Sequence, residues 1–98
     1  MSLKLEISDD AREEIDEIFA LYEQRKLGLG EQFLSALVRQ LTRIKENPEL
    51  YAVLYKRTRC GFLRRFPYVV YYRIEVDSIV VIAVQHGHQN PRDWRRRA

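Results

Sequence analysis

The feature that most constrains this chain is a dense run of β-branched and aromatic residues in its second half, at positions 66–74 and 79–86. The two segments read FPYVVYYRI and IVVIAVQH. Such side chains fit the pleated, half-buried surface of a sheet, so each segment predicts a strand. The gap at 75–78 is short enough for a hairpin, although it lacks the Asn-Gly or Asp-Gly pair that would fix the turn type. Because the second segment ends at His86, any chemistry is expected where this hairpin ends.

Ahead of the hairpin, the chain has the pattern of a short strand followed by two helices. Residues 3–7 alternate apolar and polar side chains, which predicts a strand. Ser8 offers an N-cap, and the acidic residues Asp9 and Asp10 suit the positive end of a helix dipole. Glycines at 28 and 30 separate a helix ending near Lys26 from a second helix ending by Asn47-Pro48. Each helix has an apolar stripe expected in the core: Ala11, Ile15, Ile18, Phe19 and Tyr22, then Phe33, Leu34, Leu37, Val38, Leu41 and Ile44. The acidic side chains of the first helix are expected to form a solvated face: Glu13, Glu14, Asp16, Glu17 and Glu23.

After Pro48 the pattern changes from helical to strand-like. Strands are predicted at 51–59 and 62–66, ahead of the hairpin. Alternation along the first hairpin strand predicts that Val70, Tyr72 and Ile74 face the helices. The fold class is therefore α+β: an N-terminal strand, an antiparallel helical hairpin, then a largely antiparallel twisted sheet of three to four strands.

Length and composition are those of one soluble globular domain spanning 1–98, with 46% hydrophobic and 32% charged residues. No apolar run approaches the roughly 20 residues of a membrane span, and the N-terminus does not resemble a secretory signal. Cys60 is the single cysteine, which excludes an internal disulfide and a cysteine-based metal site and favours a buried small residue. A cytoplasmic protein without a cofactor fits these features.

Charge is distributed unevenly between the two halves of the chain. Residues 1–50 hold 7 Lys/Arg and 11 Asp/Glu, a net charge of −4, whereas residues 51–98 hold 10 and 3, a net charge of +7. Nine of the ten later cations are arginine, which grips phosphate and carboxylate groups through several planar donors. A basic strand half therefore points to an acidic partner, either nucleic acid or an acidic protein segment, although a basic surface kept for solubility remains the alternative.

Several side chains in the second half could carry function. His86 and His88 suit acid–base work or a hydrogen bond to a partner, whereas a metal site lacks further ligands. The alternative for His86 is a strand-end residue whose ring nitrogens pair with backbone. Tyrosines 68, 71 and 72 could stack on bases but are more often core residues. Trp94 is expected to anchor the tail and leave its arginines, Arg95 among them, exposed. The strand arginines could form a basic sheet face or simply its solvated side: Arg57, Arg59, Arg64, Arg65 and Arg73.

The order of these elements and the spacing of a few side chains resemble the RelE/ParE superfamily of toxins from type II toxin–antitoxin, or plasmid stabilisation, systems. The resemblance covers essentially the whole chain. Its most specific part is residues 65–73, RFPYVVYYR, followed by the 79–84 strand, His86, Pro91, Trp94 and Arg97. It implies a small α+β toxin that is neutralised by an acidic, partly disordered antitoxin in a toxin–antitoxin hetero-oligomer.

The superfamily contains two activities: ParE-like members poison DNA gyrase, and RelE-like members cut mRNA on the ribosome. This chain lacks the RelE pattern, because Tyr68 stands where an arginine is usual and a His-Gly-His segment stands where a tyrosine is common. It also departs from ParE-like relatives at Gln89, where an arginine is usual. The resemblance therefore favours a ParE-like gyrase poison, with a RelE-like mRNA interferase or an inactive, antitoxin-binding relative as alternatives. A nuclease would use His86, His88, Arg59, Arg64 and Arg65; target or antitoxin binding would use Arg57, Arg59, Arg64, Arg65, Arg73, Trp94 and Arg95.

Overall fold

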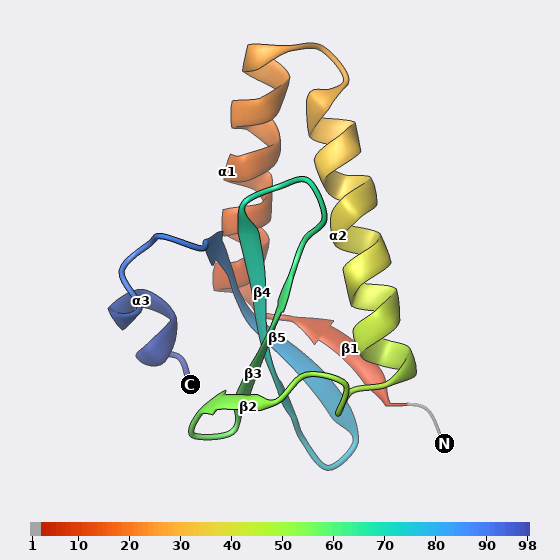
Figure 1. Ribbon diagram of the computed structural model, residues 1–98, viewed down its shortest axis with the longest axis vertical. Coiled ribbons are helices and arrows are strands. Elements are labelled where there is room, and N and C mark those ends of the chain that lie inside the picture. Colours follow the sequence, from red (N-terminus) through yellow and green to blue (C-terminus); the bar gives the residue numbers. More distant parts are fainter. Residues whose placement is uncertain (1–2) are drawn as a thin grey trace.

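The computed structural model describes residues 3–98, which form five strands and three helices. The strands are β1 (Lys4–Ile7), β2 (Val53–Tyr55), β3 (Thr58–Phe62), β4 (Tyr68–Ile74) and β5 (Ser78–His86). The helices are α1 (Asp9–Arg25), α2 (Leu29–Glu46) and α3 (Arg92–Arg95). Helices α1 and α2 form an antiparallel pair whose connection projects beyond the sheet, and α3 lies to one side near the C-terminus (Figure 1). The predicted α+β class is confirmed.

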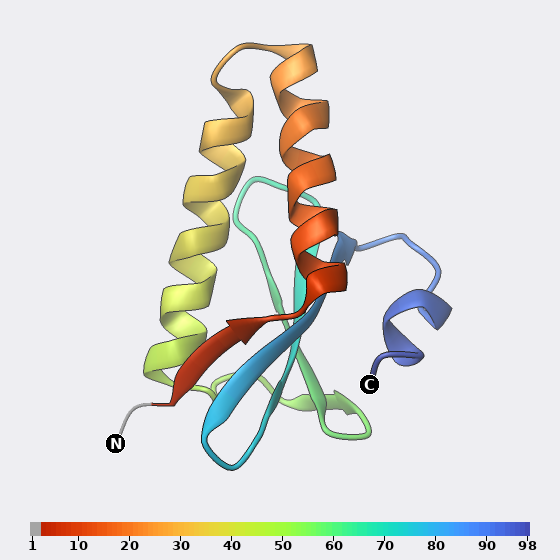
Figure 2. The same ribbon diagram turned by 180° about the vertical axis from the view of Figure 1, so that it is seen from behind.

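The β4–β5 hairpin is the centre of one five-stranded sheet with the order β1-β5-β4-β3-β2. Tyr68 opposes His86 at one end of the hairpin, and Ile74 opposes Ile79 at the other. The predicted turn is closed where the Glu75 N–H donates to the Ser78 carbonyl at 2.7 Å. β1 runs parallel to β5, while the other pairs are antiparallel. A parallel pair cannot be joined by a tight turn, and here α1, α2 and strands β2–β4 all lie between β1 and β5 in the chain (Figure 2).

The helical hairpin is fixed by local capping at both ends of α1. Ser8 is the N-cap, as predicted, and its hydroxyl accepts the Ala11 N–H at 3.2 Å. At the other end, the Glu23 carboxylate accepts the N–H groups of Gly28 and Gly30, at 3.0 and 2.8 Å. Gly28 has φ +90°, which a residue with a side chain rarely adopts. Glu23 therefore organises the turn, and its assignment to a solvated face was wrong.

The sheet buries a different set of side chains on each face. The helix-facing core includes Val70 and Tyr72, with Ile74 packed against it, as the alternation predicted. The opposite face holds a smaller cluster built on Val69, Tyr71, Ile82, Ala83 and Trp94. The second cluster means that the sheet has no fully solvated face, because the C-terminal segment folds back to cover part of it.

The segment from 51 to 59 differs from the prediction of one strand. The chain reverses after Tyr55 in a turn where Lys56 has φ +53°, and β3 starts at Thr58. Gly61 falls in the gap between the strands predicted at 51–59 and 62–66 but lies inside β3. A Cβ at Gly61 would stand 2.8 Å from the Gln40 amide nitrogen and 2.9 Å from the Tyr51 ring. This glycine therefore admits two side chains that pack against the strand.

The strand predicted at 62–66 is also wrong, because only Phe62 belongs to β3. The chain must reverse there to pair β3 with β4, and the Leu63 N–H donates to the Tyr68 carbonyl at 3.0 Å across the resulting loop. Arg65 takes φ +70° within this loop. Chain reversal thus overrode the apolar pattern of the segment.

The core prediction for α2 holds except at one position. Phe33, Leu37, Leu41 and Ile44 are buried, but Val38 is 59% exposed. Among residues 3–98, no helix combines the length and the hydropathy needed to cross a membrane.

Candidate functional site

The five strand arginines do not form one basic face. Arg57 and Arg73 both pair with Glu75, at 3.7 and 3.4 Å. Arg59 lies on the other face of β3, and its guanidinium donates to the Tyr51 carbonyl at 2.6 Å. The remaining two, Arg64 and Arg65, are exposed in the β3–β4 loop. The structure therefore places Arg57 and Arg73 at one surface and Arg64 and Arg65 at a second, while Arg59 lines neither.

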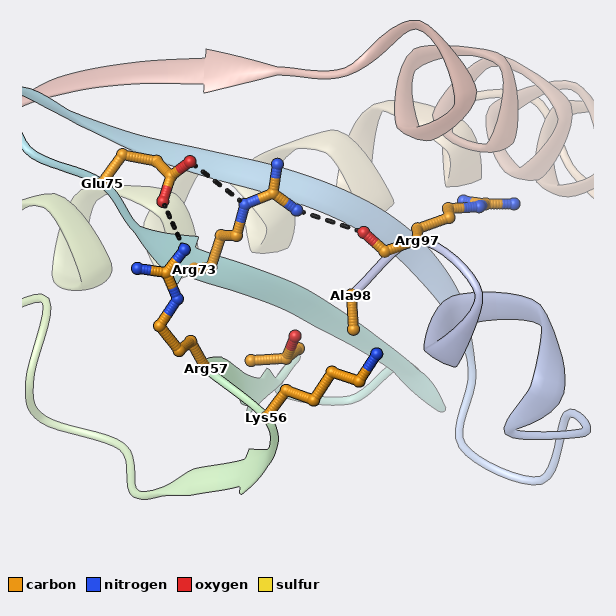
Figure 3. Close-up of a pocket in the computed structure, with 7 residues that line it drawn as sticks. Lys56, Arg57, Arg73, Glu75, Arg97 and Ala98 are labelled. Atoms are coloured by element: carbon orange, nitrogen blue, oxygen red, sulfur yellow. Dashed lines mark hydrogen bonds and ion pairs between the residues drawn. The ribbon is translucent and has the colours of Figure 1, made fainter.

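The first surface is a cavity of about 400 Å³ beside the β2–β3 turn. Figure 3 shows Arg57 and Arg73 directed at Glu75, with the Arg97 carbonyl accepting from Arg73 at 3.1 Å. The Arg97 guanidinium points away from the cavity (Figure 3). The cavity is lined by Lys56, Arg57, Thr58, Arg73, Glu75, Arg97 and Ala98.

The second surface is a groove of about 770 Å³ between the outer side of α2 and the β3–β4 loop. Apolar side chains are open to solvent in it, with Phe62 68% and Val38 59% exposed. Arginines from both walls accompany them: Arg39, Arg43, Arg64 and Arg65. An apolar strip with cationic edges is suited to an acidic amphipathic segment.

The two histidines lie at the end of β5 next to the β3–β4 loop. The His86 ring packs edge-on against Tyr68 with 5.5 Å between centroids, and the Gly87 N–H donates to the Pro67 carbonyl at 2.8 Å. His86 Nδ1 accepts the His88 N–H at 3.1 Å. One ring nitrogen of His86 is thus paired with backbone, which agrees with the alternative that His86 is a strand-end residue.

The predicted anchor role of Trp94 agrees with its packing. Trp94 is 4% exposed, and its ring stacks on Tyr71 with centroids 4.4 Å apart. Arg95 remains exposed and lies over the Tyr55 ring at 4.9 Å. Indole burial therefore places α3 against the second cluster and holds its outer arginines toward solvent.

The prediction that all tail arginines are exposed was wrong for Arg97. Its guanidinium forms a double hydrogen bond with Glu14 of α1, at 2.8 and 3.1 Å. The same carboxylate accepts the Val84 N–H at 3.0 Å and the Gln85 side-chain amide at 2.7 Å. The hydrogen bond with Glu14 raises the pKa of the Arg97 guanidinium above its ordinary value. α1, β5 and the tail thus meet at one carboxylate.

Glu14 was assigned to the solvated face, and this assignment was wrong, because its side chain is only 18% exposed. The sequence did contain a signal for it. Glu14 lies three residues after Ala11 and four before Ile18, both buried, so helical spacing places it on the core side of α1. A carboxylate on a buried stripe needs partners, and the tail supplies a cation.

The three tyrosines of the hairpin pack within the protein. Tyr71 and Tyr72 are 7% and 0% exposed, and burial raises the pKa of Tyr72 to about 12. Tyr68 packs against Tyr22 and Phe33 of the helices. These rings contribute to the core. Within residues 3–98, no group of His, Cys, Asp and Glu side chains gathers in a way that could hold a metal ion.

Comparison with known protein families identifies the family to which this fold belongs. Residues 5–91 match the family model described as the ParE toxin of type II toxin–antitoxin system, parDE. The chain belongs to the ParE toxin family. Two Mycobacterium tuberculosis proteins, each named Toxin ParE2, from strains CDC 1551 / Oshkosh and H37Rv, are 30% identical to it over 92 residues. The match covers 93% of this chain and 88% of each relative.

A solved structure described as the chromosomal ParDE TA system from P. aeruginosa has the same fold as this ParE-type toxin. The TM-score is 0.75, and the match covers 86% of this chain and 95% of the other at 16% sequence identity. The sequence-based assignment to the superfamily, with its ParE-like branch, is confirmed.

In this ParE-type toxin, the residues that a nuclease would require are only partly brought together. His86 opposes Tyr68, where the loop carrying Arg64 and Arg65 enters β4. Arg59 opposes Tyr72, four residues further along β4, roughly 13 Å away along the strand.

Proposed function

We propose that this ParE-type toxin inhibits growth in bacteria by poisoning DNA gyrase and is held inactive by an acidic antitoxin. Membership of the ParE family supports the toxin activity, and ParE-like members act on gyrase. The charge contrast between its halves, −4 in residues 1–50 and +7 in residues 51–98, supports an acidic partner for the strand half.

The separation of the candidate nuclease residues favours gyrase over ribosome-bound mRNA. Cutting RNA requires an acid, a base and cations around one phosphate, within hydrogen-bond reach of it. Arg59 is held by the Tyr51 carbonyl and opposes Tyr72, four residues along β4 from the Tyr68 that opposes His86. Nδ1 of His86 already accepts the His88 N–H. Arg59 is therefore too far along β4 to share a phosphate with His86.

Two parallel assays test the proposal. Purified toxin is added to a DNA supercoiling reaction with gyrase and, separately, to an in vitro translation reaction whose mRNA is mapped for cleavage. We expect loss of supercoiling and uncut mRNA. Cleaved ribosome-bound mRNA with intact gyrase activity would favour the RelE-like alternative, and no effect in either assay, with tight antitoxin binding, would favour an inactive relative.

The groove along α2 is the surface we propose for the antitoxin. Its open apolar residues Phe62 and Val38 offer contact area, and Arg64 and Arg65 offer charge partners for acidic side chains. Replacing both arginines, Arg64→Glu and Arg65→Glu, should weaken antitoxin affinity about tenfold or more and flatten its salt dependence.

The control makes the same change of charge elsewhere. Arg12→Glu with Lys26→Glu alters two exposed cations on and beside α1 that do not line the groove. Affinity for the cognate antitoxin is measured for both double variants by calorimetry. Equal losses in the two variants would mean that net charge, rather than the groove, governs binding.

A further inference from the structure

The sheet ends at β1 on one side, and the outer edge of this strand is open. Within residues 3–98, β1 pairs with β5 alone and is the first strand of the order β1-β5-β4-β3-β2. It lies at the outside of the sheet, near the lower ends of the two long helices (Figure 2). An edge strand presents a row of backbone N–H and C=O groups to which another strand can be added. This edge is separate from the antitoxin groove, which lies between α2 and the β3–β4 loop.

Alternation along β1 decides which backbone groups face the open edge. The Ser8 N–H donates to the Val81 carbonyl of β5 at 3.0 Å, and the Lys4 N–H donates to the residue before β5 at 3.3 Å. Even-numbered residues therefore direct their N–H and C=O groups toward β5, so Leu5 and Ile7 direct theirs outward. Within residues 3–98, these outward groups have no hydrogen-bond partner. β1 thus offers donors and acceptors to a second strand.

The side chains of β1 divide between two faces. Leu5 and Ile7 pack against the helix-facing core, as does Leu3 just ahead of the strand, but all three are only partly buried. Lys4 and Glu6 are exposed on the opposite face. Neither of them forms an ion pair with another residue in the range 3–98. A cation and an anion thus lie on one exposed face beside the open backbone edge, and both are available to a partner.

A second copy of this chain fits this edge in a single antiparallel register. With a two-fold axis at Leu5, each Lys4 opposes the partner's Glu6, and the two Leu5 residues oppose each other. Leu3 then opposes the partner's Ile7, so apolar side chains meet on the helix side. A shift of one residue would set Leu5 opposite a residue whose backbone is already bonded to β5. A shift of two would set Lys4 opposite the partner's Lys4, or Glu6 opposite the partner's Glu6, and like charges in opposed positions are destabilising.

We propose that this ParE-type toxin, when free of antitoxin, forms a two-fold dimer in which the β1 strands join the two sheets edge to edge. The outward backbone groups of Leu5 and Ile7 form hydrogen bonds across the axis, and the two contacts between Lys4 and the partner's Glu6 fix the register. The net charge of +3 repels whole copies, so the attraction is local to the edge. Because residues 3–7 make a small interface, we expect a dissociation constant on the order of 100 µM.

Sedimentation equilibrium of the full chain without antitoxin, at about 10 µM to about 1 mM, measures this association by mass action. Lys4→Glu sets two carboxylates against each other at both contacts of the dimer, and Glu6→Lys sets two ammonium groups against each other. Each variant should raise the dissociation constant about tenfold or more, because two attractive pairs become repulsive. A wild-type chain that stays monomeric throughout, or variants that dimerise as it does, would overturn the proposal.

The two variants are then mixed in equal amounts. In a mixed pair both contacts again join opposite charges, so a heterodimer should form with a dissociation constant close to that of the wild type. The controls are Lys26→Glu and Glu17→Lys, which make the same changes of charge at exposed positions at the end of α1 and within it, away from β1. Each control should dimerise like the wild type. Equal losses in the controls, or no gain on mixing the β1 variants, would overturn the proposal.

Amide hydrogen exchange followed by NMR locates the contact within the dimer. The outward N–H groups of Leu5 and Ile7 should exchange about threefold or more slowly at about 1 mM than at about 20 µM, because dimer formation gives them partners. The Ser8 N–H, which is already bonded within one chain, is the internal reference and should change less. Dimerisation with unchanged exchange at Leu5 and Ile7 would overturn the assignment to β1. These measurements use neither gyrase nor antitoxin, so their outcome is independent of the proposed function.

Discussion

The most informative perturbation is at Glu14, whose two carboxylate oxygens receive hydrogen bonds from Val84, Gln85 and Arg97. Glu14→Gln keeps the length of the side chain but replaces one acceptor oxygen with an NH₂ donor. Each Glu14 oxygen accepts from an Arg97 nitrogen and from one further donor, Val84 or Gln85. In either orientation of the glutamine amide, its NH₂ group would therefore face two N–H donors and could bond to neither. The variant must lose at least two hydrogen bonds, one of them to a charged group.

The expected loss follows from these contacts. A neutral hydrogen bond contributes roughly 1 kcal/mol and one to a charged group roughly 1.5–3 kcal/mol. Because the Glu14 side chain is 18% and that of Arg97 is 25% exposed, water can replace part of the loss. We therefore expect the free energy of unfolding to fall by about 2–3 kcal/mol, from a total of about 5–15 kcal/mol for a domain.

Urea unfolding followed by circular dichroism measures this loss, and Trp94 reports the tail separately. The sequence contains a single tryptophan, which stacks on Tyr71, so its fluorescence follows the docking of α3. Undocking in Glu14→Gln should shift Trp94 emission toward that of a solvent-exposed indole. Glu17→Gln is the matched control, because Glu17 lies exposed on the same helix.

A double-mutant cycle that combines Glu14→Gln with Arg97→Gln measures the interaction energy between these two side chains. The interaction energy should be about 1–2 kcal/mol, since the two side chains share two hydrogen bonds. The reasoning is refuted if Glu14→Gln behaves like Glu17→Gln in both stability and Trp94 emission. An interaction energy near zero would show that α1 and the tail are stabilised independently.

Three further predictions concern the core. Tyr72 has its pKa raised to about 12 by burial, so its neutral form is favoured in the folded state. This stabilisation of about 2–3 kcal/mol is complete below pH 10 and is lost as the pH rises toward 12. Tyr72→Phe removes the titrating hydroxyl and its 2.8 Å hydrogen bond to the Pro48 carbonyl, so the alkaline part of its pH–stability curve should be flatter. Gly30→Ala should destabilise by about 1–3 kcal/mol in thermal unfolding, because its Cβ would stand 2.8 Å from the Phe19 ring. Trp94→Ala should lower the free energy of unfolding by about 3 kcal/mol and increase protease cleavage of the tail, because it leaves a cavity in the second cluster.

Each of these predictions has an outcome that would contradict it. Identical alkaline stability profiles for the wild type and Tyr72→Phe would remove this tyrosine as the titrating group. Gly30→Ala is compared with Ser35→Ala, an exposed position on the same helix; equal stability of the two would mean that the helices do not need the close approach. Trp94→Ala with wild-type cleavage of the tail would mean that the Arg97–Glu14 pair alone holds it.

The helical hairpin and the central strands could be predicted because their signals are local. Ser8, the glycines at 28 and 30, and the apolar spacing along α1 and α2 act within a few residues, and the structure has these helices within one or two residues of the prediction. The alternation along β4 likewise assigned Val70 and Tyr72 to the helix-facing core. The strands predicted within residues 51–66 were wrong, because pairing with β4, which is not a local signal, decides where the chain must reverse.

The candidate site was less predictable, because it depends on which distant segments meet. Arg57, Arg59 and Arg73 share one composition signal, yet pairing with β4 turns Arg59 toward the helix side, while Arg57 and Arg73 meet at Glu75. Lys56 and Thr58 carry no motif and lie in the cavity through the position of the β2–β3 turn. Charge composition therefore indicated that a basic half exists but not how its cations are grouped.

The sequence by itself determined the α+β class, the helical hairpin and the central β4–β5 pair, because period, caps and β-branched density act over short distances along the chain. The ParE-like family was indicated by the resemblance of residues 65–73 and of the side chains that follow them to known toxins. Only the tertiary structure decided the roles of Glu14 and Arg97, which lie 83 residues apart and share two hydrogen bonds. It also decided that arginines of the basic half divide between the groove beside α2 and a separate cavity. The physical reason is that burial and ion pairing depend on proximity in space, which the parallel placement of β1 and the folding back of the tail create.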